Sequence, residues 1–231
     1  MLDVNRRELK YLVSPVDVMH LQPKLSAVLS ADSHNKGNGY MVRSLYFDSL
    51  TDSDFEDKVD GYDKRQKIRL RIYDIHSDRA KLELKEKEGN AQRKRSLLLS
   101  REEAERIIRG EYAFLMTRNE ATAHRLYTLM TMKCYRPKCI VEYDRMAYCT
   151  KTNDIRITFD RNLRATELDY NIYRENLMLY PVSSASEVTM EVKYNGFLFT
   201  YIKNILNQTE QTQISNSKYC RARSISKRGR K

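Results

Sequence analysis

Charged side chains recur two residues apart in five stretches that otherwise have the pattern of β-strands. In KIRLRIY, Ile68, Leu70 and Ile72 alternate with Arg69 and Arg71. Side chains two apart on a strand share a face of the sheet, so one face would be apolar and the other charged. The other four stretches carry Glu8 and Lys10, Glu83 with Lys85 and Lys87, Glu142 and Asp144, and Glu191 and Lys193. Five such strands favour a closed antiparallel sheet with a charged lumen and helices outside.

A simpler alternative is that each charged face meets water. Glu-x-Lys pairs would then form cross-strand ion pairs that contribute little to stability. For any one of the five stretches this alternative is the better explanation. For the five together, the residues alone leave both explanations open.

Length and charge limit the organisation of the chain. At 231 residues it is predicted to be a single domain, 1–231, large enough to bury a core. The formal net charge is +11, but residues 217–231 contribute seven Lys or Arg and no acid. Without them the excess is only +4. We therefore expect a basic and mobile tail from about residue 224, behind a body of nearly balanced charge.

Targeting features and cysteine spacing point to the cytoplasm. The N-terminus MLDVNRRELK has no apolar core of a signal peptide, and no stretch reaches the roughly 18 apolar residues of a membrane span. The four cysteines show no Cys-x-x-Cys spacing, which argues against a zinc site or a disulfide framework. We therefore expect a cytoplasmic protein whose cysteines are free thiols.

The predicted elements are mostly strands, with a few helices between them. Ser14-Pro15 begins a helix that Pro23 is expected to kink or interrupt, and a capping box at Ser100 begins a helix that stops at Gly110. Further helices are expected at 120–133 and 197–207, and a loop or short helix at 49–65. Strands are expected at 6–13, 40–48, 66–74, 80–88, 92–99, 138–148, 154–168 and 187–194. This order predicts an α+β fold with an antiparallel sheet. Neither a P-loop nor a Gly-x-Gly-x-x-Gly motif is present.

A lumen of Arg, Lys and a few carboxylates suits phosphate chemistry. Arg binds two phosphate oxygens with its planar fork, and Lys supplies a point charge. Phosphoryl transfer needs the phosphates held in line and their charge neutralised by cations and a divalent metal. Hard divalent ions prefer carboxylate oxygens. The candidate carboxylates are Glu8, Glu83, Glu142 and Glu191.

Motifs along the chain occur in the order found in a known family. They are RRELKYLV, SLYFDS, KIRLRIY, LELKEKEG followed by QRKRS, VEYDRMAY, IRITFDRNLRA, TMEVKY and SNSKY. Together they resemble the VTC-type polyphosphate polymerase domain of the triphosphate tunnel metalloenzyme (CYTH-like) superfamily, over about residues 5 to 223. The resemblance implies an antiparallel β-barrel that forms a triphosphate tunnel. It also implies an enzyme that transfers the γ-phosphate of ATP onto a growing polyphosphate chain, with Mn²⁺ or Mg²⁺.

The resemblance also assigns roles to single residues. It implies that one set of cations acts on the phosphates: Lys10, Arg69, Arg71, Lys85 and Arg145. It implies further substrate contacts from Lys94, Tyr143, Ser217 and Lys218. Glu191 matches the metal-binding carboxylate, and Glu8 is the second candidate metal ligand. Because Tyr143 and Arg145 then face inward, Glu142 and Asp144 face away from the lumen.

Departures from the family pattern keep other functions open. Related CYTH hydrolases begin with Glu-x-Glu-x-Lys, and Arg6-x-Glu8-x-Lys10 is half of that motif. A tunnel triphosphatase is therefore an alternative, and a non-catalytic polyphosphate-binding module is another. Ser215 stands where the eukaryotic domains carry a second Lys. Those domains are also fused to a membrane segment, so a separate membrane protein partner is expected here. The balanced body charge argues against specific nucleic-acid binding.

Overall fold

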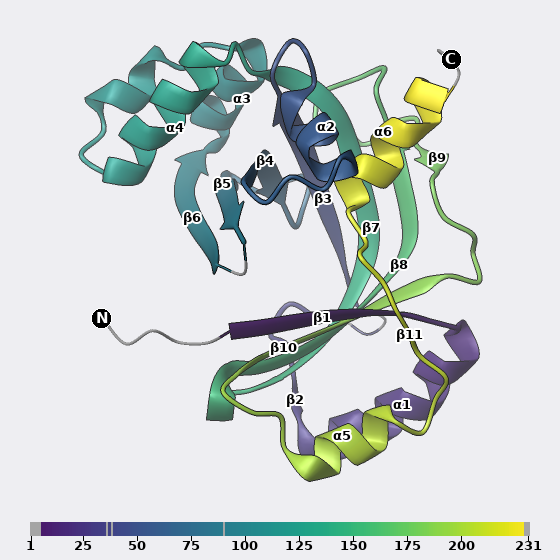
Figure 1. Cartoon of the computed structure of the whole chain (residues 1–231). Coiled ribbons are helices and arrows are strands. Elements are labelled where there is room, and N and C mark those ends of the chain that lie inside the picture. The colour runs from purple at the N-terminus through teal and green to yellow at the C-terminus, as the bar shows by residue number, and fades with distance from the viewer. Residues whose placement is uncertain (1–5, 36, 38, 90, 229–231) are drawn as a thin grey trace. The chain divides into compact units, whose positions relative to one another are not determined.

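A computed structural model describes residues 6–35, 37, 39–89 and 91–228 (Figure 1). Its strands are β1 (Arg6–Val13), β2 (Ser30–Ala31), β3 (Tyr40–Asp48), β4 (Arg65–Ile72), β5 (Arg79–Glu88), β6 (Ala91–Ser100), β7 (Arg136–Thr150), β8 (Ile155–Thr166), β9 (Tyr180–Pro181), β10 (Val188–Asn195) and β11 (Thr212–Gln213). Its helices are α1 (Pro15–Val28), α2 (Ser53–Val59), α3 (Arg101–Arg109), α4 (Ala121–Met132), α5 (Thr200–Leu206) and α6 (Lys218–Arg228), with 3₁₀ turns η1 (Ala113–Thr117) and η2 (Thr152–Asp154).

The strands follow the hydrogen-bonded order β11-β1-β10-β8-β7-β3-β4-β5-β6, with β2 beside β7 and β9 beside β8. The pairs β1–β10, β10–β8, β3–β4, β4–β5 and β5–β6 are antiparallel. The predicted α+β fold with an antiparallel sheet is therefore confirmed. Within the described residues the order has two ends, β11 and β6, so hydrogen bonding does not close it as it would in the predicted barrel.

The chain divides into two compact units. Unit 1 comprises Met1–Met41, Tyr143–Leu163 and Ser183–Asn216, and unit 2 comprises Val42–Glu142, Arg164–Val182 and Ser217–Lys231. β3, β7 and β8 each contribute residues to both units. The prediction of a single domain, 1–231, stays a prediction, and each unit is described by itself below.

The core of unit 1 lies between its strands and two helices. α1 and α5 lie side by side in this unit (Figure 1). Apolar residues of α1, α5, β8 and β10 form one buried cluster, which includes Leu21, Phe159, Met190 and Ile202. Ser14 begins α1 with the predicted capping box. Pro23 lies inside α1, which continues unbroken to residue 28, so the expected interruption there is wrong.

The core of unit 2 lies between β3–β6 and the helices α3 and α4. Its buried cluster includes Leu70, Leu82, Ile107 and Leu126. The capping box at Ser100 and the stop at Gly110 are confirmed, since Gly110 ends α3 at φ +84°. This left-handed conformation is one that glycine adopts without a steric penalty.

Helix α6 is an element that the sequence analysis missed. Residues 224–228, where a basic tail was expected to begin, continue this helix, and residues 229–231 lie outside the described part. α6 lies beside α2 in unit 2 (Figure 1). Its buried Tyr219 donates a hydrogen bond to Asp48 Oδ2 at 2.6 Å. Arg223 and Lys227 both pair with Asp52, at 2.8 and 3.1 Å.

Candidate functional site

Charged and apolar side chains alternate along β4 in unit 2, as the sequence predicted. Ile68, Leu70 and Ile72 are buried in the core of the unit, while Arg69 and Arg71 lie on the opposite face. This alternation follows from the two-residue repeat of a strand. The predicted pair of arginines therefore shares one face of β4.

Cross-strand registry places further cations on the same face. Residues directly opposite each other in an antiparallel pair lie on one face of the sheet. The rows are Ser44, Arg71, Lys81 and Leu98; Tyr46, Arg69, Glu83 and Ser96; Lys67, Lys85 and Lys94; and Arg65, Lys87 and Gln92. We call this surface of β3–β6 the cationic face. It holds four residues predicted to contact phosphate, namely Arg69, Arg71, Lys85 and Lys94.

Glu83 is the counter-ion of the cationic face. Its side chain is 3% exposed, and it accepts from Arg69 Nε at 2.6 Å and lies 3.7 Å from Arg71 Nη1. Lys94 also pairs with it. Burial raises the pKa of Glu83, but Arg69, Arg71 and Lys94 together hold that pKa well below its usual range. Glu83, a candidate metal ligand in the sequence, is therefore ion-paired with three cations.

Two tyrosines that the sequence analysis did not select lie beside the arginines. Arg69 Nη1 donates to Tyr46 OH at 3.2 Å, and Arg71 Nη1 donates to Tyr73 OH at 3.5 Å. Burial raises the pKa of the Tyr46 phenol, but Arg69 and Arg71 hold it below its ordinary value. A phenol in this position can donate a hydrogen bond to a phosphate oxygen.

The predicted Ser217 and Lys218 lie where α6 begins. Lys67 Nζ on β4 donates to Ser217 Oγ at 2.5 Å. The next residue in α6, Tyr219, stacks on Tyr46 with 5.2 Å between ring centroids. The start of α6 is therefore held against the cationic face, and Ser217 and Lys218 belong to the same group as Arg69 and Lys85.

Unit 1 carries a second charged cluster, centred on Glu191. Lys10 on β1 is directly opposite Glu191 on β10, and Glu8 is opposite Lys193. Lys193 Nζ is 3.1 Å from Glu191 Oε1, and Lys10 Nζ is 3.3 Å from Glu8 Oε1 and 3.9 Å from Glu191 Oε1. Burial raises the pKa of Glu191, but Lys193, Lys10 and Arg145 hold it well below its usual range. We call these side chains the Glu191 cluster.

Arg145 reaches the Glu191 cluster from β7. Asp160 on β8 accepts from its Nε and Nη2 at 2.7 and 2.8 Å, and Arg145 Nη2 lies 3.7 Å from Glu191 Oε2. The guanidinium also lies over the Tyr143 ring, 5.2 Å from its centroid. Burial lowers the pKa of Arg145, but Asp160 holds it well above its usual value. The sequence motifs predicted Arg145 and Tyr143 as site residues but not Asp160, whose partner lies on another strand.

The two acidic residues of β7, Glu142 and Asp144, have partners of their own. Glu142 accepts from Arg43 Nε at 2.6 Å and from Arg164 Nη2 at 2.8 Å, both in unit 2. Asp144 accepts from Asn162 Nδ2 at 2.7 Å in unit 1. Neither carboxylate contacts the Glu191 cluster through these bonds, in agreement with the expectation that they face away from the site.

The donors around Glu191 suit a hard divalent cation. Within the described ranges, no three His, Cys, Asp or Glu side chains group closely enough to hold a metal ion by themselves. However, Thr158 Oγ1 on β8, opposite Glu191, is buried without a hydrogen-bond partner among the described residues, as is Asn216 Oδ1. The Asn216 backbone oxygen accepts from Lys10 at 3.2 Å. Carboxylate, hydroxyl and amide oxygens are the ligands that Mg²⁺ and Mn²⁺ prefer.

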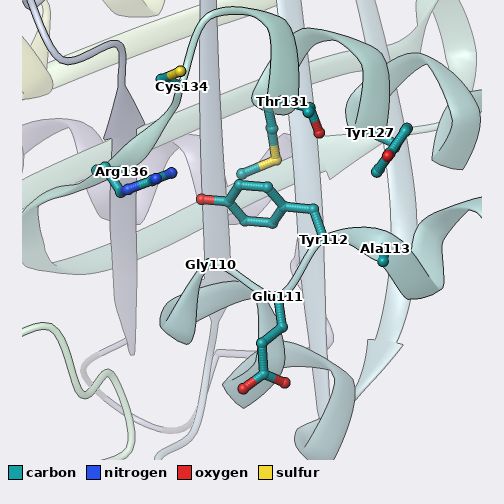
Figure 2. A pocket seen from close by; sticks show the side chains of 9 residues that line it. Gly110, Glu111, Tyr112, Ala113, Tyr127, Thr131, Cys134 and Arg136 are labelled. Atoms are coloured by element: carbon teal, nitrogen blue, oxygen red, sulfur yellow. The ribbon is translucent and has the colours of Figure 1, made fainter.

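The structure thus brings the predicted residues together in two groups, one in each unit. Unit 1 holds Glu8, Lys10, Tyr143, Arg145 and Glu191, and unit 2 holds Arg69, Arg71, Lys85, Lys94, Ser217 and Lys218. A pocket of about 540 Å³ in unit 2 is lined by none of them (Figure 2). Tyr112, Tyr127, Cys134 and Arg136 line it (Figure 2), and two of these, Tyr112 Oη and Arg136 Nη1, already share the Tyr135 carbonyl.

The fold is α+β with an antiparallel sheet, and in unit 2 the predicted phosphate-binding cations share one face of β4–β6. The VTC domain family matches residues 5–227, which is nearly the whole chain. No curated protein matches the chain. The chain belongs to the VTC domain family, a metal-dependent triphosphate tunnel family.

Solved structures support the fold. A candidate adenylate cyclase from Bacillus halodurans is similar at 14% identity and a TM-score of 0.54, with 93% of each chain covered. A candidate adenylate cyclase from Vibrio parahaemolyticus is 11% identical, with a TM-score of 0.45 over 88% of this chain and 83% of that one. The PH1819 protein of Pyrococcus horikoshii is 10% identical, with a TM-score of 0.44 over 96% of this chain and 99% of that one. The Bacillus halodurans structure, with its TM-score above 0.5, supports a shared fold.

Proposed function

We propose that this chain is a polyphosphate polymerase that transfers the γ-phosphate of ATP onto the end of an inorganic polyphosphate chain. The observation that carries the proposal is the cationic face of β3–β6. There, Arg69, Arg71, Lys85 and Lys94 point the same way in a chain of the VTC family. Such an array neutralises several neighbouring phosphates at once.

In the proposed reaction the protein supplies no nucleophile. A terminal oxygen of the acceptor chain forms a bond to the γ-phosphorus, and the bond from that phosphorus to the bridging oxygen of ATP breaks, which releases ADP. Arg69 and Arg71 would hold phosphate oxygens with their forks, and Lys85, Lys94 and Lys218 would add point charges. Lys10 and Arg145 would act in the same way from the Glu191 cluster.

The metal is the second part of the proposal. Glu191, with Glu8, Thr158 and Asn216 nearby, would hold Mn²⁺ or Mg²⁺. When bound, the ion supplies positive charge to the phosphate oxygens as their charge develops. Lys10 and Lys193 pair with Glu191 in this structure and keep its carboxylate ionised, and the metal ion would take their place beside it.

One observation favours hydrolysis as a second candidate. Glu8 lies in the Glu191 cluster, 3.3 Å from Lys10 and 4.0 Å from Lys193. A carboxylate there could orient a water toward a terminal phosphate, and the chain would then be a tunnel triphosphatase. In that case orthophosphate is released and no chain grows.

The proposed function also implies which ligands and partner the protein binds and where in the cell it acts. ATP and polyphosphate or triphosphate are the proposed ligands, a separate membrane protein is the proposed partner, and specific nucleic-acid binding is not proposed. All four cysteines are free, which supports a reducing cytoplasm. In the described part of the chain, no helix combines the length and the apolar character needed to cross a membrane.

Product analysis tests the proposal. With ATP, Mn²⁺ and a short polyphosphate primer, a polymerase yields ADP and chains longer than the primer. A triphosphatase yields orthophosphate at constant or shrinking chain length. A module that only binds leaves both ATP and primer unchanged.

A further inference from the structure

Two cations beyond those matched to the family continue the cationic face at its outer end. Arg65 on β4 lies directly opposite Lys87 on β5, and Lys87 lies opposite Gln92 on β6. The next row inward holds Lys67, Lys85 and Lys94. Arg65 is six residues from Arg71 on the same strand, so the two share a face. The cationic face is therefore four rows long.

The length of this face decides which ligand can use all of it. A strand rises about 3.4 Å per residue, so the rows of Arg71 and Arg65 lie roughly 20 Å apart. An extended triphosphate is shorter than this distance. A linear polyanion of more phosphates can contact the inner and the outer rows at once.

Charge on the outer row is not neutralised by its neighbours. Among the described residues, neither Arg65 nor Lys87 pairs with a carboxylate. Glu86 adjoins Lys87 in sequence but points to the opposite face, where it pairs with Arg95 at 3.4 Å and Arg125 at 3.1 Å. This differs from the row of Arg69, where Glu83 is an internal counter-ion. The outer row therefore presents net positive charge to a ligand.

We propose that Arg65 and Lys87 form an outer subsite for the distal phosphates of a linear polyphosphate, so that the protein prefers long chains over triphosphate. The proposal rests on the proposed function, because it assumes that the inner rows bind phosphate. Single-stranded nucleic acid is the other linear polyanion to consider. Its recognition uses aromatic platforms for the bases, and the outer row offers Arg65, Lys87 and Gln92 only.

A charge-removing variant tests the subsite. Arg65→Gln/Lys87→Gln should weaken binding of long-chain polyphosphate by about fivefold to tenfold at low salt, because two half-buried cations are lost. Binding of triphosphate should change less than about twofold, since its contacts lie in the inner rows. The salt dependence of long-chain binding should fall by about one unit of log–log slope per cation.

Two matched variants act as controls. Arg93→Gln/Lys133→Gln removes the same charge from exposed positions of unit 2 outside the cationic face and should leave both affinities unchanged. Arg65→Lys/Lys87→Arg keeps the charges and should restore long-chain binding. Thermal unfolding of each variant shows whether it is folded.

The results of these binding measurements distinguish a failure of the outer subsite from a failure of the proposed function. Equal losses for both phosphates, equal losses in the Arg93/Lys133 variant, or no loss at all would overturn the subsite. An oligonucleotide that depends on Arg65 and Lys87 as strongly as polyphosphate does would also overturn it. If wild-type protein binds neither triphosphate nor polyphosphate, the proposed function itself fails, and the subsite fails with it.

Discussion

At the scale of residues, Glu83 determines whether the cationic face is stable without a ligand. Its carboxylate lies among Arg69, Arg71 and Lys94, so Glu83→Gln leaves three cations without their counter-ion. We expect this variant to lose about 2–4 kcal/mol of unfolding free energy at pH 7, measured by denaturant titration. Glu86→Gln, on the opposite face of the same strand, should lose less than about 1 kcal/mol.

The pH dependence of this effect has a definite sign. The folded-state pKa of Glu83 lies well below its usual range, so its stabilisation is present above the unfolded pKa, about 4.3, and is lost as pH falls below it. The difference between wild type and Glu83→Gln should therefore shrink in acid. A difference that stays constant from pH 7 to pH 3 would contradict the role of Glu83 as counter-ion.

Asp54 should give the unfolding free energy the opposite pH dependence. It is fully buried in α2, and burial together with the nearby Asp48 raises its pKa to about 7, while Tyr135 donates to its Oδ2 at 2.7 Å. Because the folded pKa is raised, the stabilisation is present below about pH 4 and is lost as pH rises through about 7. Asp54→Asn cannot ionise, so it should be roughly 2–4 kcal/mol more stable than wild type at pH 8 and similar to it at about pH 4.

Thermal unfolding at the two pH values measures this difference. Asp60→Asn, an exposed change at the end of the same helix, is the control and should behave like wild type at both. An Asp54→Asn variant that is less stable than wild type at pH 8 would show that the carboxylate is ionised and structurally required.

Single residues of the site were predictable where the strand pattern alone defines a face. The alternation in KIRLRIY placed Arg69 and Arg71 together, and the pairing Lys10–Glu191 agrees with their separate strand patterns. Asp160, Tyr46 and the counter-ion role of Glu83 were not predictable. The role of each depends on which strands are neighbours in the sheet. The residue pattern of a single strand does not determine its neighbours or its register with them.

At the scale of elements, helix α6 links the C-terminal region to the cationic face. Tyr219→Phe removes the buried hydrogen bond to Asp48, and we expect a loss of about 1–3 kcal/mol of unfolding free energy. Truncation after residue 225 removes the contacts of Lys227 with Asp52, Glu56 and the Phe55 ring, together with the hydrogen bond from Ser226 to Glu167. These contacts lie at an exposed helix end, so their loss should cost only about 1 kcal/mol. The truncated protein should still bind triphosphate, because Ser217 and Lys218 remain.

Binding of triphosphate to the truncated protein, measured by calorimetry, checks this. Loss of binding on truncation, without loss of fold, would mean that the basic C-terminal residues had attracted the ligand. A Tyr219→Phe variant as stable as wild type would contradict the anchoring of α6 by Asp48.

Elements with local signals were predicted well. The capping boxes at Ser14 and Ser100 and the glycine stop at residue 110 mark helix ends in a few adjacent residues. α6 has a weaker local signal, a serine cap in which Ser217 Oγ accepts from Cys220 N at 3.3 Å, and its basic composition suggested a solvated tail. Its partners Asp48 and Asp52 lie far away in the sequence, so the contacts that hold it cannot be seen in the local pattern. Pro23 shows the reverse case, in which packing of α1 overrides a local helix breaker.

At the scale of the whole molecule, ligand binding should appear as stability. A ligand that binds only the folded state adds about 2.7 kcal/mol at 100 times its dissociation constant. For a chain of this size, triphosphate or polyphosphate should therefore raise the melting temperature by about 5–10 °C. Orthophosphate at the same concentration should raise it far less, because it can contact only one or two of the cations. Equal shifts from orthophosphate and triphosphate would indicate general anion binding.

The most direct test of the central claim is chain growth from ATP. Purified protein is incubated with Mn²⁺, primer and ATP labelled at the γ-phosphate, and the products are resolved by chain length. We predict a ladder of labelled chains longer than the primer, formed together with ADP. Glu191→Gln, which removes the proposed metal ligand, should form none while still showing a cooperative melting transition. Label that appears only in orthophosphate, or a ladder that Glu191→Gln forms equally well, would contradict the account.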